Sequence, residues 1–219
     1  MIVHLVRHAQ AFNTDRPAGA PSPPNPPLTP LGVQQAERLA ARLARVEIDR
    51  LVASPMRRAV ETADHVGRAT GRPVALLAVC HEHRAGEGYV CWGARELLAR
   101  YPKLVVPGDL HPEAWPYGDE PFERAVDRAD AFANWLREQA TVGSGQLVVV
   151  THAAISRLVL TRLLGLEPRA LAATVLHNTS LTTLRLDPTA VRPVELLAFN
   201  DTSHLAGDPA LDPLAGLSR

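Results

Sequence analysis

Each short apolar run of the chain is followed by side chains that can bind or attack a phosphate group. These side chains are Arg7 and His8 after residues 2–6, Ser54 and Arg58 after residues 51–53, His81 to Arg84 after residues 74–79, and Thr151 and His152 after residues 146–150. Imidazole is a nucleophile, guanidinium groups bind phosphate oxygens in pairs, and a carboxyl group such as that of Glu82 can protonate a leaving oxygen. The residue types therefore indicate a phosphate pocket with a nucleophile and an acid.

These side chains can meet only if the apolar runs are neighbouring strands of one sheet. Helical periodicity separates the runs, most clearly after Thr29, where an N-cap and Pro30 at the first helical position precede Ala36, Leu39 and Leu43. Alternating strands and helices are typical of a mostly parallel sheet, and ligands bind beyond the carboxyl ends of such strands. The predicted fold class is therefore α/β, a three-layer sandwich around a mostly parallel central sheet.

The whole chain, residues 1–219, is predicted to form one domain. Further helices are expected at 55–70, 94–100, 121–140 and 153–165, with two last strands at 180–186 and 193–199 toward a sheet edge. Residues 81–120 are interpreted as an insertion that acts as a lid over one end of the sheet, and residues 206–219 as a flexible tail. The proline-rich stretch 17–30 is either a plain linker or a loop that borders the site.

The composition excludes several classes of protein. Apolar residues make up 46% and charged residues 21% of the 219 residues, which is typical of a folded globular chain. The formal net charge is zero, so no basic field favours a nucleic acid or an anionic membrane as partner. Cys80 and Cys91 are too few for a disulfide scaffold, and neither a basic leader with an apolar segment nor a membrane-spanning stretch is visible. We therefore expect a cytoplasmic protein.

A zinc site is a competing interpretation of one segment. Cys80, His81, His83 and Cys91 bring metal-binding side chains within a dozen residues. Their spacing matches no usual zinc motif, and Cys80 completes an apolar run where a buried small side chain is expected. The prediction is that the chain uses neither a metal nor another cofactor.

The candidate residues stand within longer motifs. These are Arg7-His8-Ala9-Gln10 with Asn13, Leu28-Thr29-Pro30-Leu31-Gly32 with Gln35-Ala36, Ser54-Pro55-Met56-Arg57-Arg58-Ala59 with Glu61-Thr62-Ala63, Glu82 with Gly86, and Thr151-His152. Together they resemble the motifs of the histidine phosphatase superfamily, which also contains the cofactor-dependent phosphoglycerate mutases. Weaker echoes are Gly118-Asp119-Glu120 with Arg128, Asn178 with Ser180, and Asn200-Asp201. The resemblance covers nearly the whole chain and implies a phosphoglycerate mutase-like fold.

The resemblance also implies a mechanism of covalent phosphoryl transfer. His8 would attack phosphorus and form a phosphohistidine, Glu82 would protonate the leaving oxygen, and water would then hydrolyse the intermediate. Arg7, Arg58 and His152 would neutralise the charge on the phosphate oxygens. Further phosphate or substrate contacts are expected from Gln10, Asn13, Ser54, Ala153, Arg84, Tyr89 and Trp92.

Simpler roles compete for several of these positions. Ser54 could cap its helix, Asn13 could only hold a loop, and Glu87 could be the acid in place of Glu82. Tyr89 and Trp92 could pack the insertion onto the sheet rather than line the pocket. Arg57 is expected to be a solvated helix residue.

Three alanines depart from the pattern of the family. Ala9 and the pair Ala153-Ala154 stand where it usually has glycine, and a methyl group fits there if φ is negative.

The predicted function is hydrolysis of a phosphomonoester, with a small phosphorylated metabolite as the substrate. One alternative is a phosphoglycerate mutase-type phosphotransferase, in which the phosphohistidine passes its phosphoryl group to a second hydroxyl. The other is a catalytically silent module that only binds a phosphorylated ligand. The expected partner is a small phosphate ester, and the sequence leaves a homodimer open.

Overall fold

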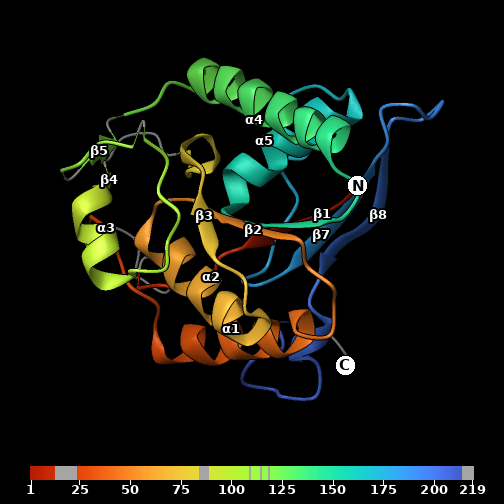
Figure 1. The fold of residues 1–219 in the computed structure, drawn as a ribbon. Coiled ribbons are helices and arrows are strands. Elements are labelled where there is room, and N and C mark those ends of the chain that lie inside the picture. The colour runs from red at the N-terminus through yellow and green to blue at the C-terminus, as the bar shows by residue number, and fades with distance from the viewer. Residues whose placement is uncertain (13–23, 84–88, 109, 114, 118, 214–219) are drawn as a thin grey trace.

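The computed structural model describes residues 1–12, 24–83, 89–108, 110–113, 115–117 and 119–213, with only the backbone course for 89, 90 and 115–117. Its main feature is a six-stranded sheet in the order β3-β2-β6-β1-β7-β8 (Figure 1). The strands are β1 Ile2–Arg7, β2 Arg50–Ala53, β3 Val74–Leu76, β6 Gln146–Thr151, β7 Leu181–Leu186 and β8 Val194–Asp201. The first four in the spatial order are parallel, whereas β7 and β8 are antiparallel additions at one side. The predicted mostly parallel α/β sheet is confirmed.

Helices cover both faces of this sheet. They are α1 Pro30–Leu43 and α2 Arg57–Thr70 on one face, and α4 Phe122–Val142 and α5 Ala153–Leu164 on the other (Figure 1). Two separate apolar cores correspond to the two interfaces, one with Leu39 and Leu43 of α1 and the other with Phe132 of α4 and Ile155 of α5. The three-layer sandwich is therefore held by burial on both faces of the strands.

The pairing of β1 with β6 brings the two candidate histidines together. The strands run parallel with Arg7 opposite Thr151, and the amide of His8 donates to the carbonyl of Thr151 at 2.8 Å. His8 and His152 therefore leave the sheet at the same point, one strand apart. This is the carboxyl edge at which parallel sheets bind ligands.

The start of α1 is positioned closely against the residues that follow β1. The side chain of Thr29 accepts from the amide of Gly32 at 3.0 Å, which is the predicted N-cap. A Cβ atom on Gly32 would lie 1.9 Å from the carbonyl oxygen of Gln10, so only glycine allows this approach. The predicted helix start is thus also the contact that supports the chain just after His8.

The third apolar run differs from the prediction. A strand was expected over residues 74–79, but β3 ends at Leu76 and residues Ala78–Cys80 form a 3-10 helix. The carbonyls of Val79 and His81 are turned out of the sheet and accept from the guanidinium of Arg128. Since these carbonyls have a side-chain partner instead of a neighbouring strand, the sheet ladder cannot continue through them.

Within the expected insertion, β4 Tyr89–Cys91 and β5 Trp115–Tyr117 form a separate antiparallel pair beside α3 Ala94–Arg100. Its action as a lid stays a prediction. A 3-10 helix at Ser203–Leu205 ends just before the expected tail, and in the tail itself turns within residues 206–213 bury Leu211. Within the described residues, no helix is long and apolar enough to cross a membrane.

Candidate active site

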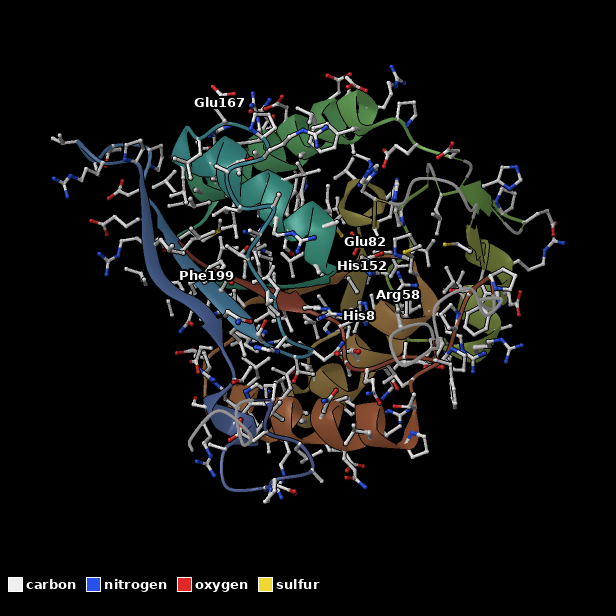
Figure 2. All side chains as sticks on the ribbon, turned by 180° about the vertical axis from the view of Figure 1, so that it is seen from behind. His8, Arg58, Glu82, His152, Glu167 and Phe199 are labelled. Atoms are coloured by element: carbon white, nitrogen blue, oxygen red, sulfur yellow. The ribbon has the colours of Figure 1, made fainter. Side chains whose placement is uncertain are left out.

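His8 is held in one ring orientation at the end of β1. Its side chain is buried, and its Nδ1 lies 2.7 Å from the carbonyl oxygen of Ala9, an acceptor that fixes the proton on Nδ1. The other nitrogen, Nε2, is then an unprotonated acceptor, and Nε of Arg58 donates to it at 3.1 Å. Figure 2 shows these two side chains pointing toward one another. The geometry thus assigns Nε2 as the nitrogen that can attack.

The electrostatic surroundings keep this nitrogen available. Burial lowers the pKa of His8 well below its usual value, and the Arg58 and Arg7 guanidiniums lower it further by like-charge repulsion. His8 is therefore neutral at physiological pH. A neutral imidazole beside two cations can attack an anionic ester that those cations bind.

The backbone on which His8 stands is braced by a strained turn. The side-chain amide of Asn178 donates to the carbonyl of His8 at 2.8 Å, and the amide of Thr179 donates to the carbonyl of Arg7 at 2.9 Å. Thr179 has a φ of 57°, a left-handed conformation that costs a β-branched residue about 1–3 kcal/mol. Such strain persists where the surrounding structure requires it, and here it lies directly behind the nucleophile.

Thr62 connects the nucleophile to the phosphate-binding arginine. Its fully buried hydroxyl accepts from the amide of Ala9 at 3.1 Å and donates to the carbonyl of Arg58 at 2.7 Å. Thr62 stands in one of the motifs of the sequence, but the sequence alone indicates no role for it. The only signal for it was a threonine one helical turn after Arg58.

His152 lies against His8 from the neighbouring strand end. The two ring centroids are 5.0 Å apart, and Nε2 of His152 lies 2.8 Å from the hydroxyl oxygen of Ser54. That hydroxyl also accepts from the amide of Met56, although the N-cap of α2 is Met56 itself. Ser54 therefore orients His152 and supports the turn before α2.

Two buried nitrogens at this edge have no hydrogen-bond partner within the described part of the chain. They are Nδ1 of His152 and Nε of Arg7. The guanidinium of Arg7 is otherwise held by the carbonyl of Leu176 at 2.5 Å. Because buried polar atoms nearly always have partners, these two nitrogens are candidates to bind acceptor oxygens of a ligand. Burial first, and then the nearby Arg58 and His8, lower the pKa of His152 well below its usual value.

The side chain of Glu82 lies against the first turn of α5, next to His152 in Figure 2. Its two carboxylate oxygens accept from the amides of Ala154 and Ile155 at 3.2 and 3.1 Å. A carboxylate is favoured at a helix N-terminus by the free amides and the helix dipole. The N-terminus of α5, where the sequence predicts that Ala153 contacts phosphate, thus binds the side chain of the predicted acid.

The segment that carries Glu82 is held by an ion-pair network from α4. Arg128 forms a double hydrogen bond with Glu120, at 2.8 and 2.6 Å, and donates to the carbonyls of Val79 and His81. His83 lies 3.2 Å from the same Glu120 carboxylate. Glu120 and Arg128 form a weak motif in the sequence, and their contacts give it a structural role: they fix the backbone on both sides of Cys80, just before Glu82.

The alanines at the usual glycine positions cause no backbone strain. In the described chain only Thr179 and Asn200 are non-glycine residues with positive φ, so Ala9, Ala153 and Ala154 all have negative values. The methyl group of Ala9 is fully buried in a small cluster with Ala11, Leu28 and Ala36.

The other predicted contact residues are placed as follows. The side-chain oxygen of Gln10 accepts from the hydroxyl of Thr29 at 2.6 Å, which connects it to α1. The ring of Trp92 is stacked between the guanidiniums of Arg57 and Arg100, at 4.8 and 4.5 Å, so Trp92 packs between α2 and α3. Asn13, Arg84, Glu87 and the side chain of Tyr89 lie outside the described residues.

The proposed metal-binding side chains have other contacts. Cys80 is buried with its thiol toward the carbonyl of Leu77, and burial raises its pKa to about 12. His81 lies 3.0 Å from the carbonyl oxygen of Glu82 through Nδ1, and burial lowers its pKa to about 4. Cys91 packs against Met56. Among the described residues, no group of three or more such side chains is arranged to hold a metal ion.

A protein-family model matches almost the whole chain. The model of the histidine phosphatase superfamily, branch 1, matches residues 3–201. The chain belongs to this superfamily. The resemblance seen in the motifs is thereby confirmed, and so is the enzyme class, a histidine phosphatase.

A serine/threonine-protein phosphatase and several solved phosphatase structures are similar to this chain. The mitochondrial serine/threonine-protein phosphatase PGAM5 of Rattus norvegicus is 29% identical over 213 residues, which cover 94% of this chain and 64% of PGAM5. This chain therefore spans just under two thirds of that relative's length.

Two solved structures share the fold at 21% identity. A putative α-ribazole-5′-P phosphatase from Escherichia coli K-12 has a TM-score of 0.68, with 92% of this chain and 97% of that one covered. A phosphoserine phosphatase of Entamoeba histolytica in complex with 3-phosphoglyceric acid has a TM-score of 0.65, with 93% and 98% covered.

Proposed function

We propose that this histidine phosphatase hydrolyses a phosphomonoester through a covalent phosphohistidine on His8. The observation that supports this most directly is the fixed ring of His8, with Nδ1 bound to the Ala9 carbonyl and Nε2 directed at Arg58. A module that only binds phosphate needs cations and amides but no oriented, neutral imidazole among them.

In the first step, Nε2 of His8 forms a bond to phosphorus while the bond between phosphorus and the ester oxygen breaks. Glu82 enters this step protonated and gives its proton to the leaving oxygen. The carboxylate that results can accept from the amides of Ala154 and Ile155, which lie within hydrogen-bond distance of its oxygens. Arg7, Arg58 and His152 stabilise the charge on the equatorial oxygens.

In the second step, water attacks phosphorus and the bond to Nε2 of His8 breaks. The carboxylate of Glu82 accepts the proton from water, and inorganic phosphate leaves. Each group thus returns to its starting state. Positioning and charge stabilisation are the main contributions that a protein makes to phosphoryl transfer, and the chain's own cations and imidazoles supply both.

The substrate class we propose is a small phosphorylated metabolite. Several solved structures of this fold are phosphatases named for small esters, among them phosphoserine and glucosyl-3-phosphoglycerate. PGAM5 is named a serine/threonine-protein phosphatase, so a phosphoserine peptide is the comparison substrate. We also propose a cytoplasmic location, supported by Cys80 and Cys91, which are both buried and unpaired.

The test is to trap the intermediate. The protein is mixed with a ³²P-labelled small phosphate ester in the presence of EDTA, quenched in alkali and separated on a gel, since phosphohistidine is stable to alkali and labile to acid. The wild type should retain label on His8, and His8→Ala should retain none. His4→Gln is the matched control, because His4 is on the same strand but contacts Thr183 and Gln146, away from the site.

The outcomes separate the three functions. Labelled protein with release of inorganic phosphate supports the phosphatase. Labelled protein that transfers its phosphoryl group to a second hydroxyl, without phosphate release, identifies a phosphotransferase of the mutase type. If the protein takes up label neither from any ester nor from the phosphoserine peptide, the proposal is overturned and the binding module remains.

A further inference from the structure

A small cavity lies beside Glu82 and is not used by the chemistry above. It has a volume of about 150 Å³ and opens between His83, the start of α4, the first turns of α5 and the loop that follows α5. Its walls include Phe122, Leu158, Ala154 and the guanidinium-bearing Arg157 and Arg169. This space equals about five water molecules at liquid density, enough for a few heavy atoms of a ligand.

The cavity is adjacent to the position of the leaving group. Glu82 must touch the ester oxygen that it protonates, so the rest of the leaving group has to extend from that point. Ala154, whose amide binds the Glu82 carboxylate at 3.2 Å, lines the cavity, and so does His83, the next residue in the chain. A substituent that leaves the ester oxygen on this side of Glu82 therefore enters the cavity.

The charge in the cavity is positive. Neither Arg157 nor Arg169 has a carboxylate partner within the described residues. The charge of Arg157 is also close enough to repel that of Arg7. No carboxylate is among the described residues that line the cavity, and Glu120 behind His83 is paired with Arg128.

Both guanidiniums are held in place. Arg157 donates to the carbonyl of Thr174 at 2.9 Å, and the guanidinium of Arg169 stacks over the ring of Phe122 at 4.3 Å. Two oriented guanidiniums without a counterion are suited to a planar carboxylate, which they can bind through paired hydrogen bonds.

We propose that this cavity binds a carboxylate on the leaving group, so that the preferred substrate is a small phosphate ester of a hydroxy acid. The inference rests on the proposed phosphatase function and adds its specificity: Arg157 and Arg169 are specificity-determining residues that recognise the acid group of the substrate. The cavity volume limits the leaving group to a short one, because the carboxylate has to reach the guanidiniums within a few atoms of the ester oxygen.

The test compares 2-phosphoglycolate with ethyl phosphate, esters whose leaving groups have the same carbon count and differ by the carboxylate. The wild type should show a lower KM for phosphoglycolate. Arg157→Gln should raise that KM by about tenfold to a hundredfold, the range expected for losing a charge-assisted hydrogen bond. The fall in kcat/KM that Arg157→Gln causes should be at least about tenfold larger for phosphoglycolate than for ethyl phosphate. Arg169→Gln should change the ratio of the two kcat/KM values in the same direction.

Arg124→Gln is the control for total charge. Arg124 is exposed on α4 and is not part of the cavity, so this variant should keep the wild-type preference for phosphoglycolate. Arg157→Lys keeps the charge but not the fork and should fall between the wild type and Arg157→Gln.

Failure of this inference is distinguishable from failure of the proposed function. Two results would overturn the cavity assignment and leave the phosphatase intact. One is a wild type that hydrolyses p-nitrophenyl phosphate but does not prefer phosphoglycolate. The other is an Arg157→Gln variant whose activity falls equally on phosphoglycolate and ethyl phosphate. If no ester is hydrolysed, the same ester pair is compared by calorimetric binding. Tighter binding of phosphoglycolate that Arg157→Gln abolishes supports the cavity, and equal binding overturns it.

Discussion

Replacing Thr62 with valine tests whether the site is held together in the way the structure indicates. Valine has nearly the shape of threonine but can neither accept from the amide of Ala9 nor donate to the carbonyl of Arg58. The Arg58 carbonyl lies within α2 and remains an acceptor for the helix backbone. The Ala9 amide is in a fully buried region and loses its partner.

The expected loss of stability in Thr62→Val follows from the amide of Ala9 alone. A buried donor without a partner costs about 1–3 kcal/mol of the free energy of unfolding. For a domain of this size, that corresponds to a fall in Tm of about 2–12 °C. Because the carbonyl of Ala9 orients the ring of His8, a displaced Ala9 also misdirects Nε2. Misplacement by about 1 Å costs on the order of 10²-fold in rate, so kcat should fall as well.

Thr70→Val is the matched control. The hydroxyl of Thr70 donates to the carbonyl of Val66 at 2.8 Å, the same bond to the preceding turn of the same helix, but it accepts from no backbone amide that the structure describes. The free energy of unfolding of this variant should fall by less than about 0.5 kcal/mol, and the variant should keep full activity. Urea unfolding of both variants gives the difference at equal m. If Thr62→Val unfolds within about 0.5 kcal/mol of Thr70→Val, the reasoning about the Ala9 amide is refuted.

Three further results are expected. Glu82→Gln should lose about 10²- to 10⁴-fold in kcat/KM on alkyl phosphates and far less on p-nitrophenyl phosphate, whose leaving group needs no proton; equal losses on the two esters would remove Glu82 from the acid role. Because the pKa of His8 is held well below 6.5, its ring takes up a proton only at more acid pH, so the phosphoenzyme burst should keep its amplitude from neutral pH to about pH 6; a decline centred near 6.5 would contradict this. Burial raises the pKa of both Cys80 and Cys91 to about 12, so a thiol reagent near pH 8 should label neither in the folded protein and both after denaturation; rapid labelling of the native protein would show that the thiols are accessible.

The sheet and much of its functional edge could be predicted from the sequence. Short apolar runs that end in polar residues identify parallel strands and their carboxyl ends, and this was enough to bring His8, Arg58 and His152 together in a prediction that the geometry matches. The start of α1 at Thr29 followed from ordinary capping rules. Local patterns succeed here because burial and capping act on neighbouring residues.

Contacts between distant side chains could not be predicted in the same way. Thr62 occupies a helical position that any medium-sized residue could fill, and its two partners appear only when α2 is packed against the chain after β1. The early end of β3 depends on Arg128, which lies far along the chain in α4 and takes up the carbonyls that a longer strand would need. Arg157 and Arg169 showed no motif, because their shared feature is a cavity wall formed by two different segments.

The position of β1 in the sheet has a consequence for how the protein is made. Ile2 pairs with Gln146 on one side and with Arg185 on the other, so the strand that leads to His8 emerges from the ribosome long before either of its partners. Pairings of such high sequence separation are slow to form, and an unpaired apolar strand is exposed to aggregation in the meantime. The strand that leads to the nucleophile is thus translated before its two partners, and His8 reaches its working position only when β6 and β7 have closed around it.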